Sequence, residues 1–93
     1  MTILDFYADW CNPCKSLAPV LDKVASERGI EVVKVNVDDD NEDLFTRHNV
    51  GEVPTVRNVP TVIVINDDGK EVARFVGTKS ESDINKFFDD IKL

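Results

Sequence analysis

Residues 5–15 read DFYADWCNPCK, and this stretch decides the fold of the chain. The apolar residues up to Tyr7 predict a buried strand, and an amphipathic helical pattern begins after Pro13. Two cysteines separated by two residues therefore lie where a strand leads into a helix. Unpaired N–H groups and the helix dipole favour negative charge at that point, so a thiolate at Cys11 is expected to be stabilised.

Asp5 is an acid in the middle of the apolar strand. Leu4 and Phe6 flank it, and both faces of a parallel strand are normally covered. Burial of Asp5 is therefore expected, rather than a position on an exposed face. Burial raises the pKa of a carboxyl group, which would let Asp5 exchange protons near neutral pH.

The hexapeptide from Trp10 to Lys15 resembles the active site of the thioredoxin family, whose usual form is WCGPCK. Asn12 stands where that motif usually has glycine. The resemblance extends over essentially the whole chain through five further features in the family's order: a buried acid (Asp5), a helix kink (Ala18-Pro19), a lysine facing the acid (Lys34), a cis-proline turn (Val59-Pro60-Thr61) and a late glycine (Val76-Gly77).

The sequence pattern predicts one α/β domain over residues 1–93. Strands are expected over residues 2–8, 31–37, 61–66 and 71–76, and helices over residues 12–28 and 41–48, with a last helix opened by Ser80. This βαβαββα order predicts a thioredoxin-like fold with a four-stranded mixed sheet flanked by helices. The strand and helix that usually precede this core in thioredoxins have no counterpart here, so residues 31–37 are expected at a sheet edge.

A short duplication departs from the family pattern. Residues 51–56 (GEVPTV) and residues 57–62 (RNVPTV) share the pattern Val-Pro-Thr-Val. Only Pro60 leads directly into an unbroken β-branched strand, whereas the strand after Pro54 would contain a proline. We therefore expect a cis bond at Val59–Pro60 and a trans bond at Val53–Pro54, with the first copy forming a mobile loop beside the site.

The resemblance implies a role for each candidate residue. Cys11, expected to be partly exposed, would attack a substrate disulfide, and the more buried Cys14 would then attack Cys11. Asp5, whose negative charge would be partly offset by Lys34, would help to deprotonate Cys14. The residues that would shape a shallow groove for an extended peptide substrate are Trp10, Val59, Pro60 and Gly77.

Composition narrows the classes of partner. The net charge of −7 argues against a nucleic-acid or anionic-membrane surface, and both cysteines belong to one motif rather than to a secreted disulfide scaffold. No signal peptide or membrane span is visible. We expect a cytoplasmic monomer that reduces disulfide-containing proteins, with a thioredoxin reductase as electron donor and no cofactor beyond the Cys11–Cys14 pair.

Two other functions are typical of related proteins with this fold. A glutaredoxin-like, glutathione-dependent enzyme is disfavoured by Trp10 and the acidic surroundings, and a non-catalytic thioredoxin-fold binding subunit remains an alternative. No metal site is expected, because residues 38–41 lack the glycine and glutamate of a calcium loop and His48 lacks ligand partners. Asn12 leaves the reduction potential open.

Overall fold

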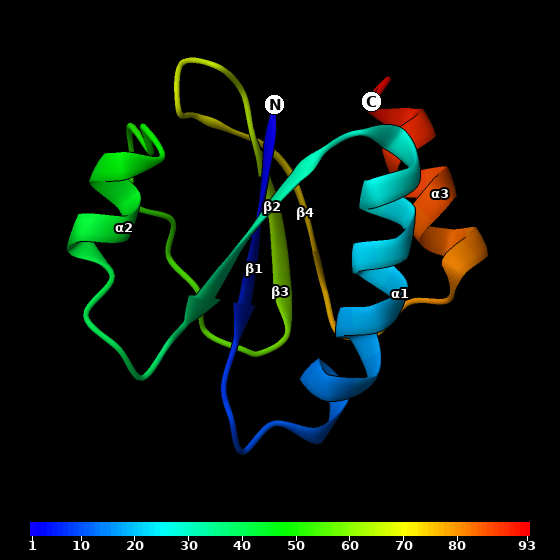
Figure 1. Cartoon of the computed structure of the whole chain (residues 1–93), viewed down its shortest axis with the longest axis horizontal. Helices are drawn as coiled ribbons and strands as arrows, with labels where there is room; N and C mark the ends of the chain where they lie inside the picture. The colour runs from blue at the N-terminus through cyan, green and yellow to red at the C-terminus, as the bar shows by residue number, and fades with distance from the viewer.

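Seven elements follow one another in the order βαβαββα in the computed structural model, which describes all 93 residues (Figure 1). The strands are β1 (Thr2–Tyr7), β2 (Glu31–Asn36), β3 (Thr61–Ile65) and β4 (Glu71–Val76). The helices are α1 (Asn12–Arg28), α2 (Glu42–Arg47) and α3 (Glu81–Asp90). The predicted element order is confirmed, and the predicted bounds differ from these by about one residue at some strand and helix ends.

The four strands form one mixed sheet in the order β2-β1-β3-β4. β1 runs parallel to β2 and antiparallel to β3, and β4 completes an antiparallel hairpin with β3. The predicted four-stranded mixed sheet is confirmed, with β2 at one edge. In the β1–β2 register Asp5 is paired with Lys34, which brings these two side chains together.

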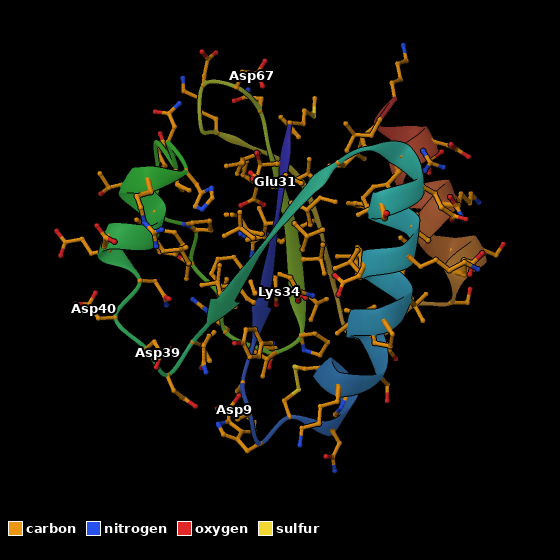
Figure 2. The ribbon with its side chains drawn as sticks, viewed as in Figure 1. Asp9, Glu31, Lys34, Asp39, Asp40 and Asp67 are labelled. Atoms are coloured by element: carbon orange, nitrogen blue, oxygen red, sulfur yellow. A yellow bond between two sulfur atoms is a disulfide. The ribbon has the colours of Figure 1, made fainter.

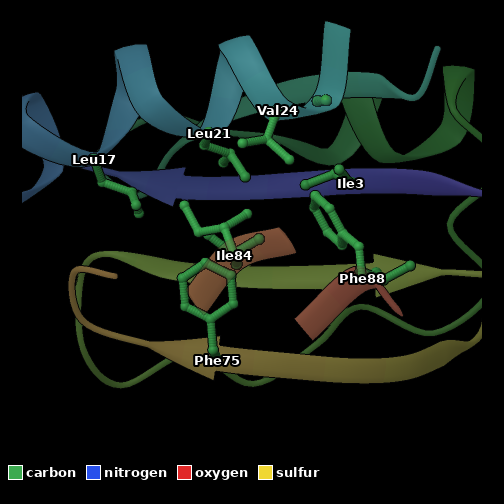
Figure 3. Packing of buried hydrophobic residues seen from close by; sticks show 10 residues of the cluster. Ile3, Leu17, Leu21, Val24, Phe75, Ile84 and Phe88 are labelled. Carbon is green, nitrogen blue, oxygen red and sulfur yellow. The ribbon is translucent and has the colours of Figure 1, made fainter. Parts of the chain in front are cut away.

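The apolar stripes of α1 and α3 cover one face of the sheet. Ile84 and Phe88 of α3 pack with Leu21 and Val24 of α1 in a single buried cluster (Figure 3). Phe87 adds an edge-to-face contact with Phe75, with ring centroids 5.1 Å apart. This packing fixes the start of α1, which carries the cysteines, relative to the sheet.

The opposite face has a thinner cover. Its buried side chains come from β1, β2 and β3: Leu4, Phe6, Val33, Val35, Ile63 and Ile65. Leu44 and Phe45 of α2 pack against them, as the sequence predicted, together with Val50 and Val56 from the connection to β3. The short helix α2 and an irregular segment therefore cover this face together.

The first copy of the duplicated hexapeptide lies in that segment, where no helix or strand forms. Its start is held by a hydrogen bond from the Gly51 N–H to the Gly69 carbonyl (2.8 Å). Its end is held by the Arg74 guanidinium, which donates to the Thr55 carbonyl (3.0 Å). The loop that the sequence predicts to be mobile is tethered at both ends to the β3–β4 hairpin, and its Val56 packs on the core.

Capping follows the sequence signals. The α1 helix ends at Gly29, whose φ of 67° lies in the left-handed region. Ser80 caps α3, because its side chain accepts a hydrogen bond from the Asp83 N–H (3.1 Å).

No helix in the structure combines the length and the apolar character needed to cross a membrane.

Candidate redox site

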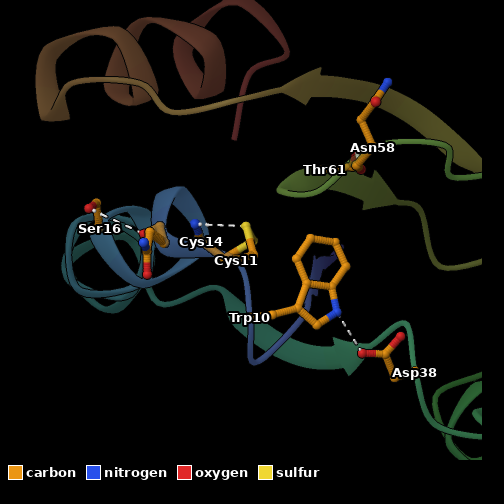
Figure 4. Close-up of a disulfide and its surroundings, with 8 residues drawn as sticks. Trp10, Cys11, Cys14, Ser16, Asp38, Asn58 and Thr61 are labelled. Atoms are coloured by element: carbon orange, nitrogen blue, oxygen red, sulfur yellow. Dashed lines mark hydrogen bonds between the residues drawn. A yellow bond between two sulfur atoms is a disulfide. The ribbon is translucent and has the colours of Figure 1, made fainter.

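Cys11 and Cys14 are joined by a disulfide at the start of α1, with their Cα atoms 5.3 Å apart (Figure 4). Cys11 is the N-cap residue, and its Sγ accepts a hydrogen bond from the Cys14 N–H (3.2 Å). Pro13 occupies the first turn, where a missing N–H costs no helix bond. An otherwise unpaired N–H of the helix therefore points at Cys11 Sγ, as expected for a site that stabilises a thiolate.

The expected difference in exposure between the two cysteines was wrong for this disulfide form. Cys11 is 4% exposed and Cys14 is 6% exposed. The reason is tertiary packing: Tyr7 and Val59 cover the small cluster that the two cysteines form with Ala8. Val59 lies far from Cys11 along the chain, so the motif alone does not indicate this cover.

Asp5 is buried on β1, as predicted. Its Oδ2 accepts a hydrogen bond from Lys34 Nζ (3.0 Å), and no other side chain contacts it through a hydrogen bond or ion pair. Burial raises the pKa of Asp5 above its ordinary value, and the neighbouring Lys34 ammonium opposes this shift. The carboxyl group is therefore suited to exchanging a proton closer to neutral pH than a surface aspartate.

A cavity of about 340 Å³ extends between this acid and Cys14. Asp5 and Lys34 line it from the sheet, and Cys14, Ala18 and Asp22 line it from α1. The cavity is large enough for several water molecules, so a proton can pass between Asp5 and Cys14 through water.

A groove lies beside Trp10, the residue that precedes Cys11. Trp10 is 68% exposed at its rim, and its Nε1 donates a hydrogen bond to Asp38 Oδ2 (2.9 Å), as Figure 4 shows. The groove has a volume of about 300 Å³ and is lined by Trp10, Val37, Val56, Arg57, Asn58 and Val59. Val56 belongs to the first copy of the duplicated hexapeptide, so this copy lies beside the site as expected.

Asn58 and Val59, in the turn before β3, line this groove. The Val59–Pro60 bond is cis and is the only cis bond in the chain, so the assignment of Pro60 rather than Pro54 is confirmed. Gly77, with a φ of 88°, donates its N–H to the Pro60 carbonyl (2.9 Å). The structure thus brings Gly77 next to the proline turn that also presents Val59.

The family model for thioredoxin matches residues 1–90 of the chain. The chain belongs to the thioredoxin family. It is 42% identical over 83 residues to Thioredoxin-T of Drosophila melanogaster, covering 87% of this chain and 48% of that protein. It is 39% identical over 89 residues to the thioredoxin of Haemophilus influenzae, covering 94% of this chain and 76% of that protein.

Solved thioredoxins have the same fold. A mutant thioredoxin from Halobacterium salinarum NRC-1 superposes with a TM-score of 0.71 at 32% identity, covering 96% of this chain and 72% of that one. Fasciola hepatica thioredoxin superposes with a TM-score of 0.69 at 33% identity, covering 96% of this chain and 78% of that one. The thioredoxin-like fold is confirmed. The chain spans about half the length of Thioredoxin-T and about three quarters of the bacterial and solved thioredoxins.

Sequence reasoning did not single out three residues of this thioredoxin site, although it expected the segment that contains Val56 to lie beside it. Asp38 pairs with Trp10, Val56 lines the groove, and Asp22 accepts a hydrogen bond from Lys34 (2.7 Å). A signal for Asp22 did exist, because Cys14, Ala18 and Asp22 recur at intervals of four and so share one face of α1. The other two depend on contacts between distant segments.

No three His, Cys, Asp or Glu side chains are grouped to hold a metal ion.

Proposed function

We propose that this chain is a dithiol–disulfide oxidoreductase that reduces disulfides in proteins. The observation that carries the proposal is the Cys11–Cys14 disulfide at the start of α1, with a groove beside the neighbouring Trp10 and a buried acid in the cavity that Cys14 lines. Membership of the thioredoxin family supports the same activity.

The reaction begins with the reduced pair. The Cys11 thiolate, stabilised by the helix start, attacks one sulfur of a substrate disulfide and forms a mixed disulfide, while the other substrate sulfur leaves as a thiolate. Cys14 then loses its proton to Asp5 through the cavity. The Cys14 thiolate attacks Cys11 Sγ, which forms the Cys11–Cys14 bond and releases the second substrate thiolate. Two electrons have passed from the protein dithiol to the substrate.

Substrate recognition uses the groove. Trp10 and Val59 offer apolar surface beside Cys11, and Gly77 flanks the Pro60 turn, so an extended segment of a protein substrate can lie across the disulfide. The tethered copy of the hexapeptide adds Val56 to this surface, and Arg57 follows it, so this segment contributes to the choice of partner.

In the cell, the protein would act as an electron carrier. A thioredoxin reductase would regenerate the dithiol, and no cofactor beyond the cysteine pair takes part. We propose that the chain acts as a single domain and a monomer in the cytoplasm, since bacterial relatives named thioredoxin match most of its length.

The first test separates the roles of the two thiols. Cys14→Ser should accumulate mixed disulfides with an insulin-type two-chain substrate, because the resolving thiol is missing, whereas Cys11→Ser should reduce the substrate no faster than the electron donor alone. Mass spectrometry of the trapped adduct and turnover with dithiothreitol as donor provide the readouts. Faster alkylation of Cys14 than of Cys11 at pH 7 in the reduced protein would reverse the assigned roles.

A further inference from the structure

The Lys34 ammonium bridges two carboxylates from different elements. It donates to Asp5 on β1 at 3.0 Å and to Asp22 on α1 at 2.7 Å. Figure 2 shows Lys34 on β2, in the half of the molecule nearer the disulfide. Lys34 is the only cation in contact with Asp5, so whatever shares this ammonium also changes the surroundings of Asp5.

The two carboxylates differ in burial. The Asp5 side chain is 5% exposed, whereas the Asp22 side chain is 49% exposed, and both line the cavity that contains Cys14. Asp22 therefore occupies the solvent side of the bridge and Asp5 the inner side. The shorter of the two hydrogen bonds goes to Asp22, so the Lys34 ammonium is shared between the two carboxylates and does not pair with Asp5 alone.

Other charged or titratable groups around the cavity are Tyr7 on β1, Asp9 after it, and Lys15 on α1. None of them makes a hydrogen bond or ion pair with Asp5, and β3 presents the apolar Val62 at this register. The charge of Asp22 raises the pKa of Asp5, after burial as the main cause and against the effect of Lys34. Burial lowers the pKa of Lys34, but its bonds to Asp22 and Asp5 outweigh this and raise it overall.

We propose that Asp22 is a positioning residue for the redox reaction: it holds the Lys34 ammonium on the solvent side of the cavity and so keeps Asp5 able to take the proton of Cys14. The role in the Cys14 step rests on the proposed function. The effect of Asp22 on Asp5 does not, because it follows from the bridge alone.

The substitution that isolates this effect is Asp22→Asn. Asparagine keeps an oxygen that can accept from Lys34, but it removes the negative charge that competes with Asp5. The ammonium should then interact more strongly with Asp5, and the pKa of Asp5 should fall. Lys34→Met should act in the opposite direction, because it leaves the buried Asp5 without a cation.

The chain offers a matched control. Glu81 accepts from Lys23 at 2.8 Å in an ion pair between α3 and α1, and its side chain is 47% exposed. Glu81→Gln therefore removes one carboxylate of similar exposure that also pairs with a lysine, with the same change in net charge. Glu81 does not line the cavity, so this variant should leave the titration of Asp5 and the turnover unchanged.

The primary measurement is the titration of the Asp5 carboxyl carbon by NMR in the oxidised protein. The cysteines do not titrate in the disulfide form, so the midpoint belongs to Asp5 without coupling to Cys14. We expect a lower midpoint in Asp22→Asn, a higher one in Lys34→Met and no shift in Glu81→Gln. An unchanged or raised midpoint in Asp22→Asn would overturn the proposal.

The second measurement tests the catalytic consequence. The pH profile of substrate reduction by Asp22→Asn should move to lower pH by the same interval as the NMR midpoint. A moved NMR midpoint with an unmoved pH profile would refute the link to Cys14 while leaving the bridge intact. Absence of all turnover in the unmodified protein would instead count against the proposed function, so the two failures are distinguishable.

Discussion

Asp5 shows how one residue ties the stability of this protein to its chemistry. Asp5→Asn should raise the free energy of unfolding at pH 7 by about 1–2 kcal/mol, because a buried carboxylate loses more hydration than one ammonium contact returns. Lys34 keeps Asp22 as a partner in this variant, so no buried cation is left unpaired. Disulfide reduction should nevertheless slow, since the proton acceptor for Cys14 is gone. Urea unfolding and turnover assays provide the two readouts.

The stability gained in Asp5→Asn should depend on pH, and the direction of this dependence follows from the pKa of Asp5. Burial raises the pKa of Asp5, so the folded protein binds this proton more tightly than the unfolded chain does. The Asp5 contribution is therefore favourable at low pH and is lost as the pH rises through the folded-state pKa. The advantage of Asp5→Asn should vanish below about pH 3 and grow toward neutrality. An advantage of constant size at every pH would show that desolvation is not its cause.

At the scale of the elements, the β3–β4 turn depends on a close approach of backbones. Gly69 has a φ of 77°, and a Cβ there would overlap the Asn49 carbonyl and the Gly51 N–H. Gly69→Ala should therefore cost about 2–4 kcal/mol, combining left-handed strain with a steric clash. The measurement is the urea midpoint of unfolding.

Gly29 provides the matched control for this turn. It also lies in the left-handed region, with a φ of 67°, but a Cβ there would meet no atom within 4 Å. Gly29→Ala should cost only about 1 kcal/mol, the conformational part alone. Equal costs at the two positions would mean that the contact between the turn and the segment around Gly51 contributes nothing.

The elements were predictable because their signals are local. Apolar runs indicate the strands, the i, i+3, i+4 stripe from Leu17 indicates α1, and Gly29 and Ser80 mark helix ends. The choice of Pro60 over Pro54 also followed from local pattern, because a proline inside a central strand would remove a ladder bond. The redox pair and the buried acid were predictable for the same reason.

The remaining features of the site arise from contacts across the fold. The cover of Cys11 by Val59 and the bond from Trp10 to Asp38 join segments that sequence periodicity does not relate. No local pattern indicates that Arg74 donates a hydrogen bond to the Thr55 carbonyl and so holds the segment of residues 51–56. Such side-chain contacts form only in the packed fold. The sequence therefore did not indicate that the loop of residues 51–56 is tethered at both ends.

At the scale of the whole molecule, residues 51–56, the first copy of the duplicated hexapeptide, are one of the parts that distinguish this chain from the family pattern. Deleting residues 51–56 should lower the free energy of unfolding by about 1–3 kcal/mol, since two tethers and the packing of Val56 are lost. The protein should still fold and reduce a small dye-linked disulfide at a similar rate. Its preference among protein substrates should change, as a competition assay with two substrates would measure.

A length-matched control separates side chains from loop length. Replacing residues 51–56 by a glycine and serine segment of equal length keeps the connection but removes Val56 from the groove. We expect this variant to show the same change in substrate preference as the deletion. An unchanged ranking of substrates in both variants would exclude a role for the segment in partner choice, and an unfolded deletion variant would mean that it is required for the fold.

The placement of the two chain ends has a practical consequence. Both ends lie on the side of the molecule opposite the start of α1, where the cysteines are (Figure 1). The N-terminal ammonium pairs there with Asp67 (3.2 Å), and the Leu93 carbonyl accepts a hydrogen bond from Arg28 (2.6 Å). A fusion tag or a tether to a solid support at either end would therefore point away from the disulfide, and the immobilised protein would present its cysteines to a passing substrate.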